Sequence, residues 1–414
     1  MDLNETEDLL RLHHATGESV PAASKPLQNV GGDPGNNAST PSTFQRLFWL
    51  ATVILLFATG LSYFAFLLIG ILLGIIYTLW HLRRQATTVQ PNRVKCIASH
   101  PDDPNAIALS FISGHISLWR KSETPMKSFS DGANDKEWKS ILTRHISSEG
   151  VRSCRFLSSG KVVTACDDGR IRVYDDKDGR QLYNFAAHDD FVRSLAVHPS
   201  RSQVLSGSDD RTVKLWDAEF NWACMRTYFG HSHYVMDVRF NPHKPQEFAT
   251  ASLDRVVFLW DLDSSEAMRV LEGHEQGVNC VAYCTQNQSV LASGSDDQTI
   301  IIWNHQTAER LHTLRGHTDN VTALLYHNEH PYLFSTSEDA TVRLWKVPMS
   351  DKEAYQPLLE HKLSSRGWAL CSFPAGFCVG HDFGCLPLEV SSSDEDGDAI
   401  QLFEHTGFPQ EKKE

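Results

Sequence analysis

The chain has 414 residues, with 51 acidic and 38 basic side chains and a formal net charge of −13. A surface that binds nucleic acid needs clustered lysine and arginine, so this balance argues against a nucleic-acid-binding protein. Length alone allows one large β domain or two or three ordinary ones. The nine cysteines are scattered singly through strand-like segments, which favours reduced thiols in a cytosol-facing domain over a disulfide framework.

The first 46 residues have the composition of a disordered tail. They are rich in serine, threonine, proline, asparagine and glycine, as in GGDPGNNASTPST, and we expect residues 1–46 to lack a packed structure. Asn4 in NET and Asn37 in NAS are glycosylation acceptors only in a lumenal tail. Their modification would therefore report on the topology of the segment that follows.

Residues 47–80 read LFWLATVILLFATGLSYFAFLLIGILLGIIYTLW and contain no charged side chain, which predicts a membrane segment. One helix of this length would span about 51 Å, against roughly 30 Å of hydrocarbon. The segment is therefore either a single tilted helix or a hairpin that breaks near Gly60 and Ser62. Arg83 and Arg84 follow it directly, whereas only Arg46 precedes it. The positive-inside rule thus places the C-terminal domain in the cytosol.

From about residue 92 the sequence repeats every 43 residues. The repeat is marked by four histidines, namely His188, His231, His274 and His317. The four repeats close on LSGSDDRTVKLWD, ATASLDRVVFLWD, LASGSDDQTIIIWN and LFSTSEDATVRLWK. A Gly-His or Ala-His opening with a Trp-Asp-like close at this period is the WD-repeat signature.

Weaker copies of the repeat lie on both sides of these four. Two precede them, at 92–120 and 150–175, and a degenerate one follows at about 358–390. Seven such units predict an all-β fold, a seven-bladed WD-repeat β-propeller over residues 85–390, in which radial closure protects the strand edges. Residues 391–414 contain SSSDEDGD, and we expect an acidic disordered tail there.

One aspartate stands six residues before the closing aromatic residue of five repeats. These aspartates are Asp168, Asp210, Asp254, Asp297 and Asp339. At a strand-turn-strand corner, an aspartate accepts backbone and histidine hydrogen bonds that keep a buried carboxylate satisfied. We therefore assign these aspartates and the four repeat histidines to holding the blades together. A His-Asp couple resembles half of a catalytic triad, but no nucleophile, base and oxyanion set accompanies it, so we expect no enzyme.

The residue before each corner aspartate varies from repeat to repeat. It is Asp167, Asp209, Leu253, Asp296 and Glu338 in turn. The fold therefore does not require a carboxylate at this position, which should face the loop surface around the central opening. A single acid at such a position is usually only solvated charge, but a cluster of four is harder to dismiss.

Residues 92–390 resemble the first propeller of the β′ subunit of coatomer, the vesicle coat that returns cargo from the Golgi to the endoplasmic reticulum. The resemblance is carried in order by RVK, AHDDFVRSLAVHPS, SGSDDRTVKLWD, GHSHYVMDVRFNP, ASLDRVVFLWDL and LEGHEQGVNCVAY. It implies a site on top of the propeller that binds the C-terminal dilysine signal of membrane cargo.

Carried over by position, the resemblance implies two sets of site residues. The terminal carboxylate would be bound by Arg93, Lys95 and Arg152, and the lysines by Asp190, Asp209 and Asp296. The chemistry agrees, since arginine offers a planar fork to a carboxylate, and carboxylates without a fixed base nearby suit mobile ammonium groups. The family continues into a second propeller and a helical solenoid that build the coat, whereas here a membrane segment precedes a single propeller.

We therefore expect a membrane-anchored recognition protein at the endoplasmic reticulum or Golgi membrane, with its propeller facing the cytosol. Its expected partners are the C-terminal tails of membrane cargo proteins, together with coat components, and no cofactor is expected. No metal is expected either, because Cys371, Cys378, His381 and Cys385 match no common zinc spacing. The alternative is a membrane-tethered WD-repeat scaffold for a protein complex unrelated to cargo sorting.

Overall fold

The computed structural model describes residues 93–121, 138–348, 353–373, 376–392 and 400–404. The predicted tail 1–46 and the predicted membrane segment 47–80 lie outside these ranges. Within them, no helix is both long enough and apolar enough to cross a membrane.

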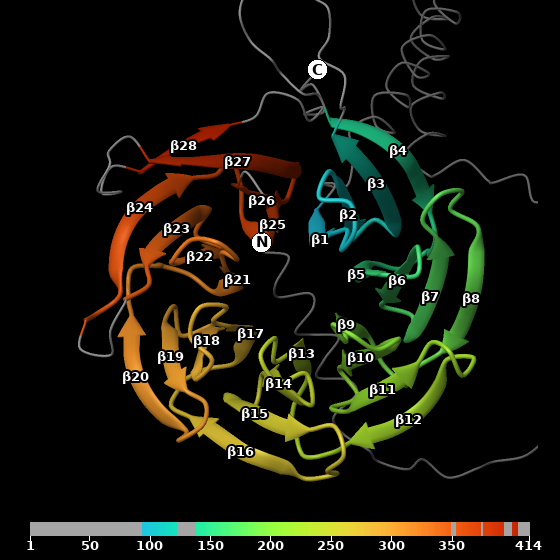
Figure 1. The fold of residues 1–414 in the computed structure, drawn as a ribbon, viewed down its shortest axis with the longest axis horizontal. Coiled ribbons are helices and arrows are strands. Elements are labelled where there is room, and N and C mark those ends of the chain that lie inside the picture. The colour runs from blue at the N-terminus through green and yellow to red at the C-terminus, as the bar shows by residue number, and fades with distance from the viewer. Residues whose placement is uncertain (1–92, 122–137, 349–352, 374–375, 393–399, 405–414) are drawn as a thin grey trace, which may run out of the picture. The chain divides into compact units, whose positions relative to one another are not determined.

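The described residues form 28 strands in seven four-stranded antiparallel sheets, which are arranged as blades around a central axis (Figure 1). The predicted seven-bladed all-β propeller is therefore confirmed. Each blade consists of four consecutive strands, ordered from the axis to the rim.

Blades 1 to 4 have these strands: β1 (Val94–Ser99), β2 (Ala106–Phe111), β3 (His115–Lys121) and β4 (Trp138–His145); β5 (Val151–Leu157), β6 (Lys161–Cys166), β7 (Arg170–Asp175) and β8 (Gln181–Ala186); β9 (Val192–Val197), β10 (Gln203–Ser208), β11 (Val213–Asp217) and β12 (Ala223–Tyr228); β13 (Val235–Phe240), β14 (Glu247–Ser252), β15 (Val256–Asp261) and β16 (Ala267–Glu272). Blades 5 to 7 have these: β17 (Val278–Tyr283), β18 (Val290–Ser295), β19 (Ile300–Asn304) and β20 (Glu309–Leu314); β21 (Val321–Tyr326), β22 (Tyr332–Ser337), β23 (Thr341–Lys346) and β24 (Gln356–Lys362); β25 (Gly367–Phe373), β26 (Gly376–His381), β27 (Gly384–Ser392) and β28 (Ile400–Glu404).

Burial falls from the inner strands of a blade to its outermost strand. In blade 5 every residue of β18 is buried, whereas β20 is largely exposed. The inner strands are covered on both faces by the neighbouring blades, so they read as continuous runs of small and apolar residues. The outermost strands face solvent at the rim, and most of their residues are exposed or half-buried.

The ring closes by packing between blades 1 and 7. Val94, Ile97 and Ile107 of blade 1 form one buried cluster with Phe373 and Cys378 of blade 7. Apolar contact between the first and last blades therefore completes the core, and blade 7 is built from consecutive strands like the other six.

The predicted end of the propeller at residue 390 is wrong. Strand β27 continues to Ser392, and β28 (Ile400–Glu404) pairs with it as the outermost strand of blade 7. The segment IQLFE lies in a stretch that is acidic overall, which masked its strand-like alternation. Part of the predicted disordered tail thus completes the seventh sheet.

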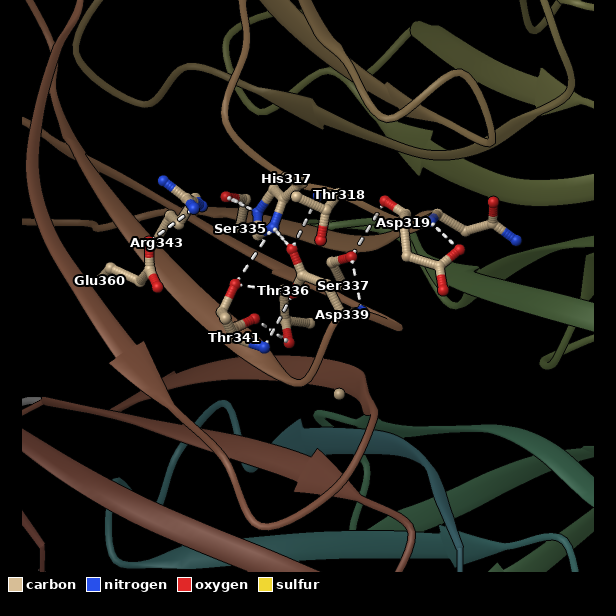
Figure 2. Close-up of polar contacts among 12 residues, drawn as sticks. His317, Thr318, Asp319, Ser335, Thr336, Ser337, Asp339, Thr341, Arg343 and Glu360 are labelled. Atoms are coloured by element: carbon tan, nitrogen blue, oxygen red, sulfur yellow. Dashed lines mark hydrogen bonds and ion pairs between the residues drawn. The ribbon is translucent and has the colours of Figure 1, made fainter.

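A chain of hydrogen bonds ties each corner of blades 3 to 6 to the blade core, as Figure 2 shows for blade 6. His317 Nδ1 lies 2.8 Å from Asp339 Oδ2, and His317 Nε2 lies 2.8 Å from Ser335 Oγ. Trp345 Nε1 donates to the same serine oxygen at 2.9 Å. These hydrogen bonds agree with one tautomer of the histidine, in which Nδ1 donates to the aspartate and Nε2 accepts from the serine hydroxyl.

The same chain recurs in the three preceding blades. The histidine to aspartate distances are 2.7 Å for His188 with Asp210, 2.7 Å for His231 with Asp254, and 2.8 Å for His274 with Asp297. Burial alone would raise the pKa of these aspartates, but the hydrogen bonds and charge of histidine, together with hydrogen bonds from neighbouring backbone and hydroxyl groups, hold the pKa below its ordinary value.

Blade 2 departs from this pattern. The loop before it carries no repeat histidine, and Asp168 instead forms an ion pair with Arg172. The aspartate also accepts the backbone N–H of Arg170 at 3.1 Å. The corner carboxylate is therefore satisfied here by an arginine of the next strand.

The structure predicts that replacing Asp210 by asparagine lowers the free energy of unfolding by about 1–3 kcal/mol at pH 7, because buried donors of His188 and Thr212 lose their carboxylate. The lowered pKa means that the stabilisation is present at neutral pH and is lost as the pH falls below about 5. Between pH 7 and pH 2.5, the free energy of unfolding measured by urea denaturation should therefore fall less in Asp210→Asn than in the wild type.

The exposed neighbour Asp189 provides the control. Asp189→Asn should change the free energy of unfolding by less than about 0.5 kcal/mol. Equal effects of the two substitutions would contradict the assignment of Asp210 to the corner.

Candidate binding site on the propeller axis

A cavity that is open to solvent lies on the axis and is lined by the innermost strands of all seven blades. Its wall contains one equivalent residue from each blade. We call these residues the bulge ring: Lys95, Arg152, Arg193, Met236, Asn279, Thr322 and Trp368.

Each residue of the bulge ring is the extra residue of a β-bulge. In blade 1, for example, Val94 pairs with Phe111 and Cys96 pairs with Ser110, so that Lys95 has no partner on β2. The same skip occurs at the second residue of the innermost strand in every other blade. A bulge frees a residue from the ladder and turns its side chain, which here faces the axis.

The bulge ring divides into a basic side and a neutral side. Blades 1 to 3 contribute Lys95, Arg152 and Arg193, whereas blades 4 to 7 contribute methionine, asparagine, threonine and tryptophan. Three basic side chains from adjacent strands are therefore concentrated on one side of the cavity, within a chain of net charge −13.

The two arginines of the bulge ring are paired with acids of their own blades. Arg152 Nε lies 2.6 Å from Asp167 Oδ1. Arg193 binds Asp209 through two parallel contacts, Nε to Oδ1 at 2.7 Å and Nη2 to Oδ2 at 2.6 Å. Such a forked arrangement is the strong form of an arginine–carboxylate pair.

Lys95 is different, because no carboxylate of the described residues lies within ion-pair distance of it. Its Nζ instead lies 3.5 Å from the centre of the Trp368 ring, a cation–π contact. Burial lowers the pKa of Lys95, and the positive charges of Arg152, Arg93 and Arg193 lower it further. This uncompensated charge makes Lys95 the natural contact for an anionic ligand.

Arg93 lies next to the basic side of the bulge ring and is paired with the acid Asp382. Arg93 Nε donates to Asp382 Oδ1 at 2.8 Å, and its guanidinium lies 4.5 Å from the centre of the Trp368 ring. Trp368 Nε1 and Arg366 Nε also contact the Asp382 carboxylate, at 2.7 Å and 3.5 Å. Arg93 and Lys95 thus both contact the ring of Trp368, and the indole N–H of this ring donates to Asp382.

The structure brings together the three residues expected to bind a carboxylate. Arg93 and Lys95 share the face of Trp368, and Lys95 and Arg152 are adjacent members of the bulge ring. Their mutual repulsion is visible in the lowered pKa of Lys95. The set is therefore one cluster, even though its members come from two blades.

The three residues expected to bind lysine have different surroundings. Asp190 is exposed, and its carboxylate accepts only the backbone N–H of Phe191, at 2.8 Å, among the described groups. Asp296 is half-buried and accepts a hydrogen bond from Asn279 at 2.7 Å. Burial raises the pKa of Asp296, as does the negative charge of Glu338. No basic side chain of the described residues lies within ion-pair distance of Asp296.

The expectation that Asp209 faces the loop surface without a fixed base nearby is wrong. Only 4% of its side chain is exposed, and Arg193 occupies both of its oxygens. The bulge on β9 is the cause, because it turns Arg193 toward the acid. Asp167 and Arg152 repeat the arrangement in blade 2.

Sequence reasoning missed Arg193, Trp368 and Asp382 as parts of this site. A usable signal exists in the repeat, since the bulge-ring residue is the one that follows the first residue of each innermost strand, as in VRS and VNC. An alignment of the seven repeats at that position would identify the seven residues of the bulge ring from the sequence.

The repeats match a known family model, and these matches agree with the fold. Five segments match the WD domain, G-beta repeat: residues 137–175, 179–217, 222–261, 265–304 and 308–346. Together they cover less than half of the chain, and the first three strands of blade 1 and all of blade 7 lie outside them. The fold and these matches define a seven-bladed propeller built from WD repeats.

Among curated proteins, the chain is similar to coatomer β′ subunits. It is 37% identical to human Coatomer subunit beta' over 184 residues, which is 44% of this chain and 18% of that protein. It is 38% identical to the Putative coatomer subunit beta'-3 of Oryza sativa subsp. japonica over 176 residues, 42% of this chain and 18% of that one. The match thus spans about a fifth of the length of these relatives and supports a coatomer-like propeller.

A more distant similarity involves another WD-repeat protein. The chain is 31% identical to human WD repeat and SOCS box-containing protein 1 over 103 residues, which is 25% of this chain and 24% of that protein.

The pairing of Asp209 with Arg193 predicts a stability effect. Asp209→Leu should lower the free energy of unfolding by on the order of 2 kcal/mol, because it leaves a largely buried guanidinium without its partner. Blade 4 has Met236 and Leu253 at the two corresponding positions. The double variant Arg193→Met, Asp209→Leu should therefore recover most of the loss, as measured by a urea double-mutant cycle.

Additive losses from the two single substitutions would show that the pair is not energetically coupled. A stability-neutral Asp209→Leu would restore the earlier interpretation of this residue as a free surface acid.

Proposed function

We propose that this chain is a membrane-anchored, coatomer-β′-like propeller that binds C-terminal dilysine-type tails of membrane proteins in traffic between the Golgi and the endoplasmic reticulum. The similarity to coatomer β′ supports a propeller of vesicle traffic. The observation that carries the finer proposal is the uncompensated charge of Lys95 beside Arg93 and Arg152, with the unpaired acids Asp190 and Asp296 on other blades.

A C-terminal carboxylate suits the basic side of the cavity. It would supply the counter-charge that Lys95 lacks and would reduce the repulsion among Lys95, Arg93 and Arg152. The flat guanidinium groups can bind two oxygens at once, whereas the ammonium group of Lys95 adds a point charge. A tail amidated at its C-terminus offers no charge for this side.

The lysines of the tail require acids that have room for an ammonium group. Asp190 is exposed, and Asp296 is held only by the neutral amide of Asn279. Asp209 is already bound by Arg193, so a lysine at Asp209 must share or displace that arginine. A tail that carries both charges can replace this pair, because its carboxylate can bind Arg193 while one of its ammonium groups binds Asp209.

The energetics require several contacts at once. An exposed ion pair contributes about 0–1 kcal/mol, whereas micromolar affinity needs roughly −8 kcal/mol. The half-buried positions of Lys95 and Asp296 allow stronger contacts than those of a free surface. The tail must therefore engage both the basic and the acidic residues to bind usefully.

The predicted membrane segment 47–80 and the basic residues Arg83 and Arg84 support anchoring with the propeller in the cytosol. A tether would hold the propeller near the membrane, where the cytosolic tails of other membrane proteins end. The effective concentration of such tails would exceed their average concentration, so modest affinity would suffice.

The test is calorimetry of the 414-residue chain, in detergent, against a peptide ending in Lys-x-Lys-x-x and against its C-terminal amide. We expect binding of the free acid only. Lys95→Met should weaken binding at least about tenfold, the size of a lost partly buried ion pair. Asp296→Asn should also weaken binding of the dilysine peptide, because it removes an acid that is available to a lysine of the tail.

Lys177→Met removes an exposed lysine at the turn between β7 and β8, which does not line the cavity, and provides the matched control. Equal binding of the acid and the amide, or no binding of either, would overturn the proposal. Either result would favour a WD-repeat scaffold that is unrelated to cargo sorting.

A further inference from the structure

One cysteine on the cavity wall is bound by an arginine of the neighbouring blade. Cys96 follows the bulge of β1, is 8% exposed and lines the axial cavity. Arg155 Nη1 on β5 lies 2.7 Å from Cys96 Sγ and 2.8 Å from the carbonyl oxygen of Cys154. The guanidinium therefore bridges blades 1 and 2 through a sulfur atom.

Among the described groups, Arg155 contacts this sulfur and a carbonyl oxygen directly, and the charge of Asp237 acts on it without forming an ion pair. Arg155 forms no ion pair with a carboxylate of the described residues. The nearby acid Asp237 is already bound by Arg239 Nε at 3.0 Å and by Ser194 Oγ at 2.7 Å. Because arginine stays protonated at any ordinary pH, a donor this close to sulfur favours the thiolate form.

The neighbouring thiol of Cys154 has the largest effect on the pKa of Cys96 and lowers it. Burial raises this pKa and the charge of Arg155 lowers it, so that the pKa lies well below its ordinary value. The cavity wall also carries the basic side of the bulge ring. A positive surrounding with access to solvent is the environment of a reactive thiol.

The propeller contains its own comparison, Cys280. This residue occupies the same position after the bulge in blade 5, is 4% exposed and lines the same cavity. Its sulfur contacts only the carbonyl oxygens of Gly294 and Val321, both at 3.9 Å, among the described groups. Blade 6 has Leu325 at the position where blade 2 has Arg155.

Burial consequently raises the pKa of the Cys280 thiol far above its ordinary value. The two cysteines share a cavity, a position in the repeat and nearly the same exposure. Two groups of the neighbouring blade, the Arg155 guanidinium and the Cys154 thiol, distinguish the surroundings of Cys96 from those of Cys280.

We propose that Cys96 is a modification site, a thiolate on the propeller axis that reacts with small two-electron oxidants of the peroxide class. In the reaction, the Cys96 thiolate attacks one oxygen of hydrogen peroxide, so that an S–O bond forms and the O–O bond breaks. Hydroxide leaves and takes a proton to become water. The sulfur is oxidised to a sulfenic acid, and the peroxide is reduced.

Cys154 supplies a partner for the oxidised sulfur. Cys96 Sγ lies 3.5 Å from the carbonyl oxygen of Cys154, and Cys154 Sγ lies 3.9 Å from that of Cys96. The Cys154 thiol can then attack the sulfenic sulfur, which forms an S–S bond, breaks the S–O bond and releases water. The product is a disulfide between strands β1 and β5. This chemistry does not depend on the binding of any tail.

The experiment measures the modification of Cys96 and Cys280 in the same folded 414-residue chain. The protein is treated with hydrogen peroxide and the sulfenic acid trapped with dimedone, or with iodoacetamide across pH 6 to 9, and peptides are quantified by mass spectrometry. At pH 7 we expect Cys96 to be modified at least about tenfold faster than Cys280, since one pKa unit corresponds to a tenfold change in thiolate. Trapped sulfenic acid or a Cys96–Cys154 disulfide after peroxide would each support the proposal.

Two variants separate the charge of Arg155 from its packing. Arg155→Leu gives Cys96 the neighbour that Cys280 has, so its alkylation rate at pH 7 should fall toward that of Cys280 and its pH profile should move upward. Arg155→Lys keeps the positive charge and should retain most of the reactivity. Equal rates for the two cysteines in the wild type would overturn the proposal, as would unchanged Cys96 reactivity in folded Arg155→Leu.

Discussion

The β-bulge in the innermost strand of each blade determines what the propeller presents on its axis. Without it, the second residue of that strand would pair with its neighbour and lie on one face of the sheet. With it, seven side chains leave the ladder and line one cavity, and the residue after each bulge lies directly beside them. Both the basic side of the bulge ring and the position of Cys96 follow from this one backbone feature.

The two adjacent aspartates of blade 3 have different partners, one at the blade corner and one in the bulge ring. Asp210 binds His188 and belongs to the corner, while Asp209 binds Arg193 of the bulge ring. The second partnership varies between blades, being Arg152 with Asp167 in blade 2 and Asn279 with Asp296 in blade 5. A residue can therefore be dispensable for the fold in general and still be buried and paired in one blade.

The 43-residue period predicted the seven blades and their corners, because hydrophobic alternation and turn residues are local signals. It did not predict β28, since five residues in an acidic stretch are too short a pattern to separate from a tail. Nor did it predict the pairing of Arg193 with Asp209. A bulge shifts the side-chain alternation by one residue, so the inward position of Arg193 becomes visible only when the register of β9 and β10 is known.

Most charged side chains on the axis are paired with each other within the protein, and this limits what can bind there. Arg93, Arg152 and Arg193 are each held by an acid, while Lys95 and Arg155 lack a carboxylate partner among the described residues. Lys95 lies against an aromatic ring, and Arg155 lies against a sulfur. A purely cationic ligand would find only Asp190 and Asp296 without a basic partner among the described residues, so the arrangement favours a ligand that carries both charges, or a reaction that uses the Cys96 sulfur.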